Sequence, residues 1–194
     1  MKVLLLGHSF VPRLETYIES EADYKINSSF DISSIDTKFV HGGSTILKIS
    51  KRLHHIRQWL PEIVILQCGG NDISNGSRPE KVGFEISEFA TKLLSLGVRQ
   101  VVICQLISRF RLRSTSKLDV KSYNKNVSIA NTYLYHICQV EDNILFWQHD
   151  GFRKAETPNM DYYCDDLVHL SNSGNRKLYK SIRGAILFLK NKLQ

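Results

Sequence analysis

The sequence predicts an α/β fold in which a five-stranded parallel sheet lies between two layers of helices. Short, continuous apolar runs alternate with longer segments in which apolar residues recur every three or four positions. Continuous apolar runs are typical of parallel strands covered on both faces, and the longer spacing is typical of helices with one buried face. This alternation favours a three-layer α/β/α sandwich with a flavodoxin-like strand order.

Five segments are expected to be strands. They are residues 2–7, 36–40, 62–67, 99–106 and 143–147. Helical spacing follows over residues 46–60, 82–93 and 123–137, and a last helix is expected to begin near Ser171 or Ser173. In such sheets ligands bind at the carboxyl ends of the strands, so the loops after the strands are the first places to look for chemistry.

The length and composition predict one domain spanning residues 1–194. Hydrophobic residues make up 42% of the chain and charged residues 23%, which excludes a disordered, coiled-coil or collagen-like chain. No run approaches the ~18 apolar residues of a spanning helix, and the first apolar run stops at Gly7, too early for a signal peptide. We expect a cytoplasmic protein with no integral membrane segment. The four cysteines show no C-x-x-C spacing, which favours reduced thiols.

Basic residues give the chain a net charge of +7, which favours an anionic partner. Arg109, Arg111 and Arg113 alternate with Phe110 and Leu112 in the loop after the fourth strand. This pattern predicts contact with an anionic membrane surface or with RNA, although a solvated surface explains it as well. The oligomeric state is not indicated by the sequence.

Polar residues follow the first three strands. Ser9 lies between the first strand and a helix that includes Pro12, where it is either an exposed hydroxyl or a helix cap. Gly43 follows the second strand in a Gly-Gly pair, whose backbone N–H groups can face a ligand. Asn71 follows Gly69 and Gly70 after the third strand, where its amide can donate to a developing negative charge or simply form a turn.

The loop before the last helix contains Asp166 and His169. Their three-residue spacing lets the carboxylate accept the Nδ1 proton of the imidazole and direct Nε2 outward, which is half of a catalytic triad. An Asp-rich turn with a half-buried histidine is the plainer alternative. Metal binding is disfavoured because no third ligand follows at a helical spacing, so neither a metal nor a cofactor is expected.

The chain resembles the SGNH hydrolases, also called GDSL esterases and lipases, along nearly its whole length. The matching segments are Gly7-His8-Ser9-Phe10, Gly43 with Ser44-Thr45, Gly69-Gly70-Asn71-Asp72 and Asp166-Leu167-Val168-His169. The resemblance implies that Ser9 is the nucleophile, His169 the general base and Asp166 its orienting carboxylate. It also implies an oxyanion hole made by Ser9, Gly43 and Asn71. His8 and Phe10 depart from the family's Asp and Leu.

A narrower similarity concerns the opening Leu-Leu-Leu-Gly-His-Ser-Phe. It is similar to esterase domains in the first open-reading-frame protein of certain vertebrate LINE-type retrotransposons. The resemblance to the SGNH hydrolases implies a serine esterase. A shallow site made of short loops suits acetyl or short-chain esters, with lysophospholipid as a lipid variant. Two alternatives stay open. One is a catalytically weak binding module for lipid or nucleic acid, and the other is a carbohydrate O-acetylesterase.

Overall fold

The computed structural model describes residues 1–20, 30, 32, 34–41, 45–152 and 159–193. The strands within these residues are β1 (Lys2–Gly7), β2 (Asp36–His41), β3 (Ile63–Gln67), β4 (Gln100–Cys104) and β5 (Ile144–Trp147). The helices are α1 (Phe10–Ser20), α2 (Ile46–Ser50), α3 (Leu53–Trp59), α4 (Gly70–Ser74), α5 (Pro79–Ser95), α6 (Val120–Ile137), the 3₁₀ turn η1 (Met160–Tyr162) and α7 (Asn172–Leu193).

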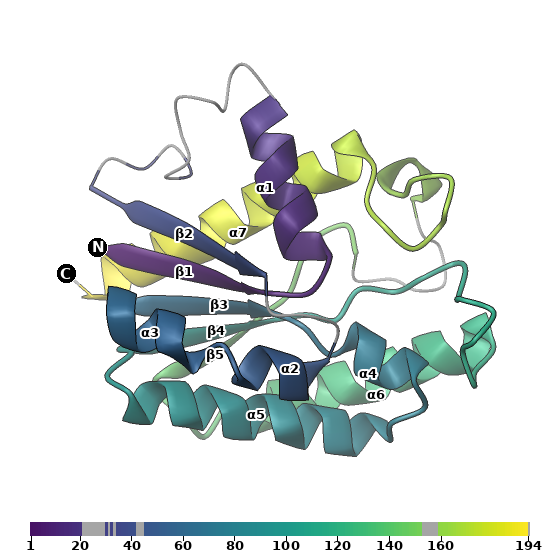
Figure 1. Cartoon of the computed structure of the whole chain (residues 1–194), viewed down its shortest axis with the longest axis horizontal. Coiled ribbons are helices and arrows are strands. Elements are labelled where there is room, and N and C mark those ends of the chain that lie inside the picture. The colour runs from purple at the N-terminus through teal and green to yellow at the C-terminus, as the bar shows by residue number, and fades with distance from the viewer. Residues whose placement is uncertain (21–29, 31, 33, 42–44, 153–158, 194) are drawn as a thin grey trace.

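The five strands form one parallel sheet in the order β2-β1-β3-β4-β5. Helices α1 and α7 cover one face, and α2 to α6 cover the other (Figure 1). The three-layer sandwich with flavodoxin-like strand order is therefore confirmed. Gly7 at the end of β1 pairs with His41 of β2 and Gln67 of β3, so three strands end side by side. The loops that follow them consequently meet at one edge.

Two apolar cores hold the sheet between the helices. Alternate residues of β1 face opposite layers, with Leu4 and Leu6 in the core beneath α5 and Val3 and Leu5 in the core beneath α1 and α7. All five residues of β3 are buried, and the first four of them are apolar, as expected of a strand covered on both faces. The four cysteines are free thiols.

Two predicted elements differ from the structure. The expected helix 46–60 is broken into α2 and α3, because the N–H groups of Lys51 and Arg52 bond to carbonyls three residues back and end the first helix. The fourth strand ends at Cys104, two residues early. Beyond it, the backbone of Leu106 bonds to the side chain of Asn131 on α6 in place of a neighbouring strand.

The longest helix, α7, begins at Asn172, between the two serines where its start was expected. Its buried face packs against β1 and α1, and its other face holds most of its basic residues. Among the described residues, no helix combines the length and the apolar composition that a membrane crossing requires.

Candidate active site

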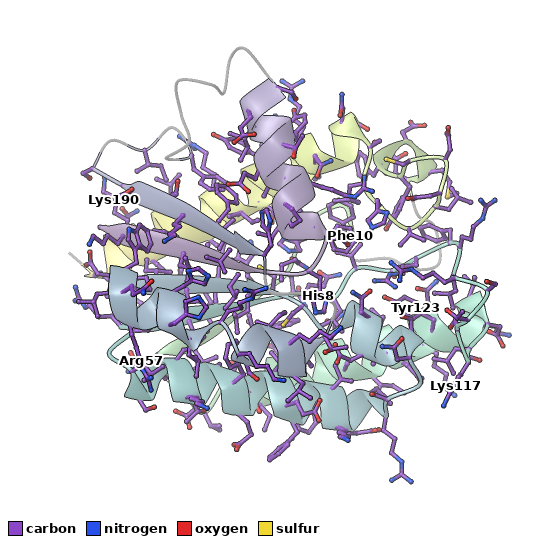
Figure 2. All side chains as sticks on the ribbon, in the orientation of Figure 1. His8, Phe10, Arg57, Lys117, Tyr123 and Lys190 are labelled. Carbon is purple, nitrogen blue, oxygen red and sulfur yellow. The ribbon has the colours of Figure 1, made fainter. Side chains whose placement is uncertain are left out.

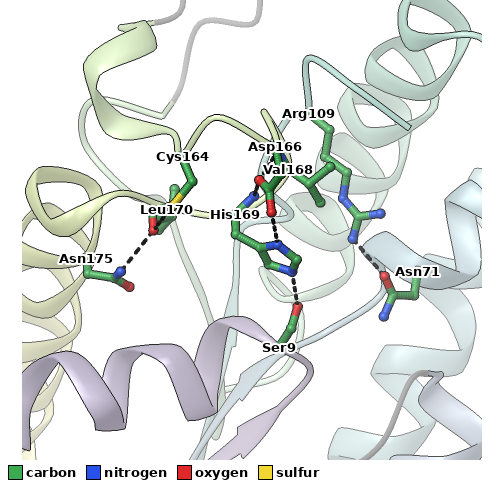
Figure 3. Close-up of polar contacts among 9 residues, drawn as sticks. All are labelled: Ser9, Asn71, Arg109, Cys164, Asp166, Val168, His169, Leu170 and Asn175. Atoms are coloured by element: carbon green, nitrogen blue, oxygen red, sulfur yellow. Dashed lines mark hydrogen bonds and ion pairs between the residues drawn. The ribbon is translucent and has the colours of Figure 1, made fainter. Parts of the chain in front are cut away.

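Ser9 and His169 are 160 positions apart in the chain and meet at the carboxyl end of the sheet (Figure 3). Strand β1 ends at Gly7, and Ser9 lies in the short turn that joins it to α1. A Cβ at Gly7 would clash with the carbonyl oxygen of Gln67, so only glycine lets β1 approach β3 this closely. The Ser9 Oγ lies 3.1 Å from Nε2 of His169, within hydrogen-bond reach of a general base.

Asp166 shapes its own loop and orients the imidazole. Its Oδ1 accepts hydrogen bonds from the backbone N–H groups of Val168 at 2.9 Å and His169 at 2.8 Å. Its Oδ2 lies 2.6 Å from Nδ1 of His169. Because a carboxylate accepts the Nδ1 proton, the tautomer that this pair favours leaves Nε2 free to accept the Ser9 proton.

The loop around Asp166 favours the ionised carboxylate. Burial by itself raises the pKa of Asp166, but the hydrogen bonds from the N–H groups of His169 and Val168 and from the imidazole outweigh it. The pKa of this carboxyl is therefore held well below its usual range. Asp166 is therefore charged near neutral pH and orients the imidazole, so Nε2 of His169 is placed to accept the hydroxyl proton of Ser9.

Besides Ser9, two residues were predicted to form the oxyanion hole, and the structure describes one of them, Asn71. Gly43 lies outside the described residues. Asn71 lies in the first turn of α4, after Gly69, whose φ of +99° is in the region that favours glycine. The Oδ1 of Asn71 accepts a hydrogen bond of 2.8 Å from Nη2 of Arg109 (Figure 3). Asp72, the neighbouring carboxylate, accepts from the Ile46 N–H at the start of α2.

His8 and Phe10, which depart from the pattern of the SGNH hydrolases, lie where β1 passes into α1 (Figure 2). Both residues line a small pocket. The Phe10 ring lies edge-on to the imidazole of His169, with ring centres 6.3 Å apart. His8 is buried, and burial together with the charge of Arg109 lowers its pKa to about 4. It therefore carries no charge near neutral pH, unlike the aspartate that the family places there.

A correction concerns the basic loop. Arg109 was expected beside Arg111 and Arg113 at the surface, but its side chain is buried, with an exposed fraction of 7%. Arg111 and Arg113 are exposed as expected. Phe110 packs edge-on against Tyr163 with ring centres 4.8 Å apart and is no free membrane anchor. Binding of RNA or an anionic membrane stays a prediction, now resting on Arg111 and Arg113.

The inward direction of Arg109 follows from contacts that its local sequence does not reveal. Asn124 of α6 accepts from the Arg109 N–H at 3.0 Å and donates to its carbonyl at 2.8 Å. Asn131 makes the same pair of bonds with Leu106 at 2.8 and 3.0 Å. The signal available in the sequence was the seven-residue spacing of these two asparagines, which places them on one face of the helix.

Two buried histidines predict acid sensitivity of the fold. His149 is fully buried between Gln67 and Ser181, and burial lowers its pKa to about 3. The pKa of His8 is lowered from 6.5 to about 4. In both cases the unfolded chain binds a proton first as the pH falls, so the stability present above pH ~6.5 is lost between about 6.5 and 4 for His8 and between about 6.5 and 3 for His149.

Thermal unfolding followed by circular dichroism should therefore show a Tm that falls steadily from pH ~7 to ~4. His8 alone contributes on the order of 3 kcal/mol over this window. Asp72 changes the free energy of unfolding in the opposite direction. Burial raises its pKa to about 6, so its contribution to stability is lost as the pH rises. A Tm that stays constant across the window would contradict the expectation that the two imidazoles together outweigh Asp72.

Comparison with solved structures supports the fold. A GDSL-like lipase from Bacteroides thetaiotaomicron matches with a TM-score of 0.74 and 16% identity, over 97% of this chain and 88% of that chain. A carbohydrate esterase family 3 protein from Talaromyces cellulolyticus matches with a TM-score of 0.69 and 18% identity over 100% of both chains. An acetyl esterase mutant with an acetate ion matches with a TM-score of 0.70 and 16% identity, also over 100% of both.

No protein-family model matches the sequence, and the comparison with curated proteins found no match. The structural likeness therefore concerns the fold. The chain has the five-stranded α/β fold that GDSL-type acylhydrolases and esterases share. What the chain does with this fold has to be argued from its own side chains.

Proposed function

We propose that the protein is a serine esterase in which Ser9 is the nucleophile, His169 the general base and Asp166 the residue that orients the imidazole. The observation that supports this most directly is the continuous set of contacts from Asp166 Oδ2 to His169 Nδ1, at 2.6 Å, and from His169 Nε2 to Ser9 Oγ, at 3.1 Å. The structural neighbours include an acetyl esterase and a GDSL-like lipase, which supports ester chemistry.

The reaction begins when Nε2 of His169 takes the proton of the Ser9 hydroxyl as Oγ attacks the ester carbonyl carbon. The carbonyl oxygen becomes an oxyanion, which accepts hydrogen bonds from the Nδ2 amide of Asn71 and the backbone N–H groups of Ser9 and Gly43. Collapse of this intermediate breaks the bond to the alcohol, which leaves with the proton from the imidazolium. Water then attacks the acyl-enzyme by the same route and releases the acid and Ser9.

Small acyl groups are the proposed substrates. The small pocket at the ends of the strands is lined by His8 and Phe10, the neighbours of Ser9 in the chain, and by Leu106, which favours acetyl and short-chain esters over long acyl chains. An acetyl xylan esterase and the carbohydrate esterase of family 3 are among the structural neighbours, which favours carbohydrate O-acetyl groups as a second candidate. Lysophospholipid is the lipid variant. A retrotransposon origin stays a prediction from the opening residues.

A series of p-nitrophenyl esters tests this proposal. Acetate and butyrate should be hydrolysed with much higher kcat/KM than octanoate and palmitate, because long chains do not fit the pocket. Acetylated xylan assayed in parallel distinguishes a carbohydrate esterase from a general one. Absence of hydrolysis for every ester would contradict the proposal and favour a binding module of the same fold.

A further inference from the structure

The guanidinium of Arg109 is buried beside the proposed active site among neutral groups. Its Nη2 donates to Asn71 Oδ1 at 2.8 Å, its Nη1 lies 3.4 Å from Ser74 Oγ, and its central carbon lies 5.2 Å from the ring centre of Tyr123. Among the described residues its Nε has no hydrogen-bond partner. Burying a cation costs free energy of folding unless the cation is paired with an anion. A buried guanidinium among neutral groups is therefore expected to have a functional role.

The fold holds this guanidinium in one place. Asn124 bonds to both the N–H and the carbonyl of Arg109, which fixes the backbone from which the side chain starts. The face of Tyr123 supports the guanidinium from the α6 side. The lack of a side chain at Gly70 leaves room for the guanidinium, since a Cβ at that position would lie 3.2 Å from Nη2. Arg109 is therefore buried through several independent contacts.

Arg109 also decides which way the Asn71 amide faces. A guanidinium has only donors, so the group that faces it must be the amide oxygen of Asn71 and not the nitrogen. The nitrogen is consequently turned away from Arg109 (Figure 3). Without this partner, the two ends of the amide are nearly equal in shape, and either can face the substrate.

We infer that Arg109 is a positioning residue for the oxyanion hole: it holds Asn71 with its N–H donors toward the oxyanion. The inference rests on the proposed esterase function. An inverted amide would present its oxygen to the developing negative charge and oppose the reaction.

Arg109→Met tests the inference, because methionine fills much of the same space without charge or donors. We expect kcat for p-nitrophenyl acetate to fall by about tenfold or more, with KM changing little, because the effect falls on the transition state. The Tm should stay the same or rise, because a buried cation without a carboxylate partner is removed. Arg109→Lys should recover part of the lost kcat.

Arg57→Met is the matched control. It removes an arginine at an exposed position on α3 and should leave kcat and Tm unchanged. A purely structural role for Arg109 predicts the opposite pattern for Arg109→Met, namely a lower Tm with wild-type kcat in the folded fraction. That result would overturn the inference.

A double-mutant cycle separates this inference from the proposed function. Asn71→Ala alone should lower kcat by about a hundredfold or more. Adding Arg109→Met to Asn71→Ala should cost little further, because Arg109 acts through Asn71. A full additional loss would show that Arg109 acts elsewhere and would overturn the inference. Wild-type protein without esterase activity, or activity that survives Ser9→Ala, would instead contradict the proposed function.

A second variant keeps the inference testable if Arg109→Met does not fold. Asn71→Asp preserves the shape of the side chain and the acceptor for Nη2, and it pairs Arg109 with a carboxylate. It replaces the amide donor by an anionic oxygen, so kcat should fall at least as far as in Asn71→Ala while the Tm rises. Retained activity in Asn71→Asp would show that the amide N–H is not required.

Discussion

Replacing Ser9 by alanine should lower kcat for ester hydrolysis by roughly a millionfold, the loss expected when a catalytic nucleophile is removed. The expectation rests on the position of the hydroxyl, 3.1 Å from the imidazole Nε2 of His169 at the end of β1. Stability should hardly change, because the side chain is only half-buried and losing one hydrogen bond costs about 1 kcal/mol. The measurements are steady-state kinetics with p-nitrophenyl acetate and the Tm.

Ser20→Ala is the matched control for this variant. Ser20 lies at the other end of α1, where its hydroxyl donates to the Tyr17 carbonyl. The substitution removes a hydroxyl from the same helix region and should leave kcat unchanged. Hydrolysis at the wild-type rate in Ser9→Ala would mean that another group performs the chemistry, and the proposed triad would then be wrong.

The sheet could be predicted because a strand buried on both faces has a continuous run of apolar residues. Segments such as residues 63–66 are apolar throughout, and a parallel strand order then brings all the strand ends to one edge. Ser9 and His169 meet at that edge, although no local sequence pattern links the two residues. The Asp166–His169 contact needed only the three-residue spacing within one loop.

The features that the sequence did not predict depend on distant partners. The alternation around Arg109 is typical of an exposed loop, but Asn124 on α6 holds the Arg109 backbone, and the guanidinium is buried against Asn71. The helix expected over residues 46–60 has adequate apolar spacing and still breaks, because two three-residue turns end α2 at Lys51. Periodicity reports which face is buried and says little about such backbone turns.

Replacing Asp166 by asparagine should lower kcat by about 10⁴-fold. The amide can still accept the two backbone hydrogen bonds that Oδ1 receives from Val168 and His169, so the loop should keep its shape. Its NH₂ group then faces Nδ1 of the imidazole and favours the tautomer that has its proton on Nε2. That tautomer cannot accept the Ser9 proton, so the variant should bind substrate and fail in the chemical step.

Asp165→Asn is the matched control, because this neighbouring carboxylate is exposed and its removal changes the net charge by the same amount. We expect it to keep kcat within about twofold of the wild type, since surface substitutions away from a site have small effects. The contrast isolates the geometry of Asp166 from the charge of the loop. Equal losses in the two variants would show that the negative charge of the loop matters and that the 2.6 Å contact with Nδ1 does not.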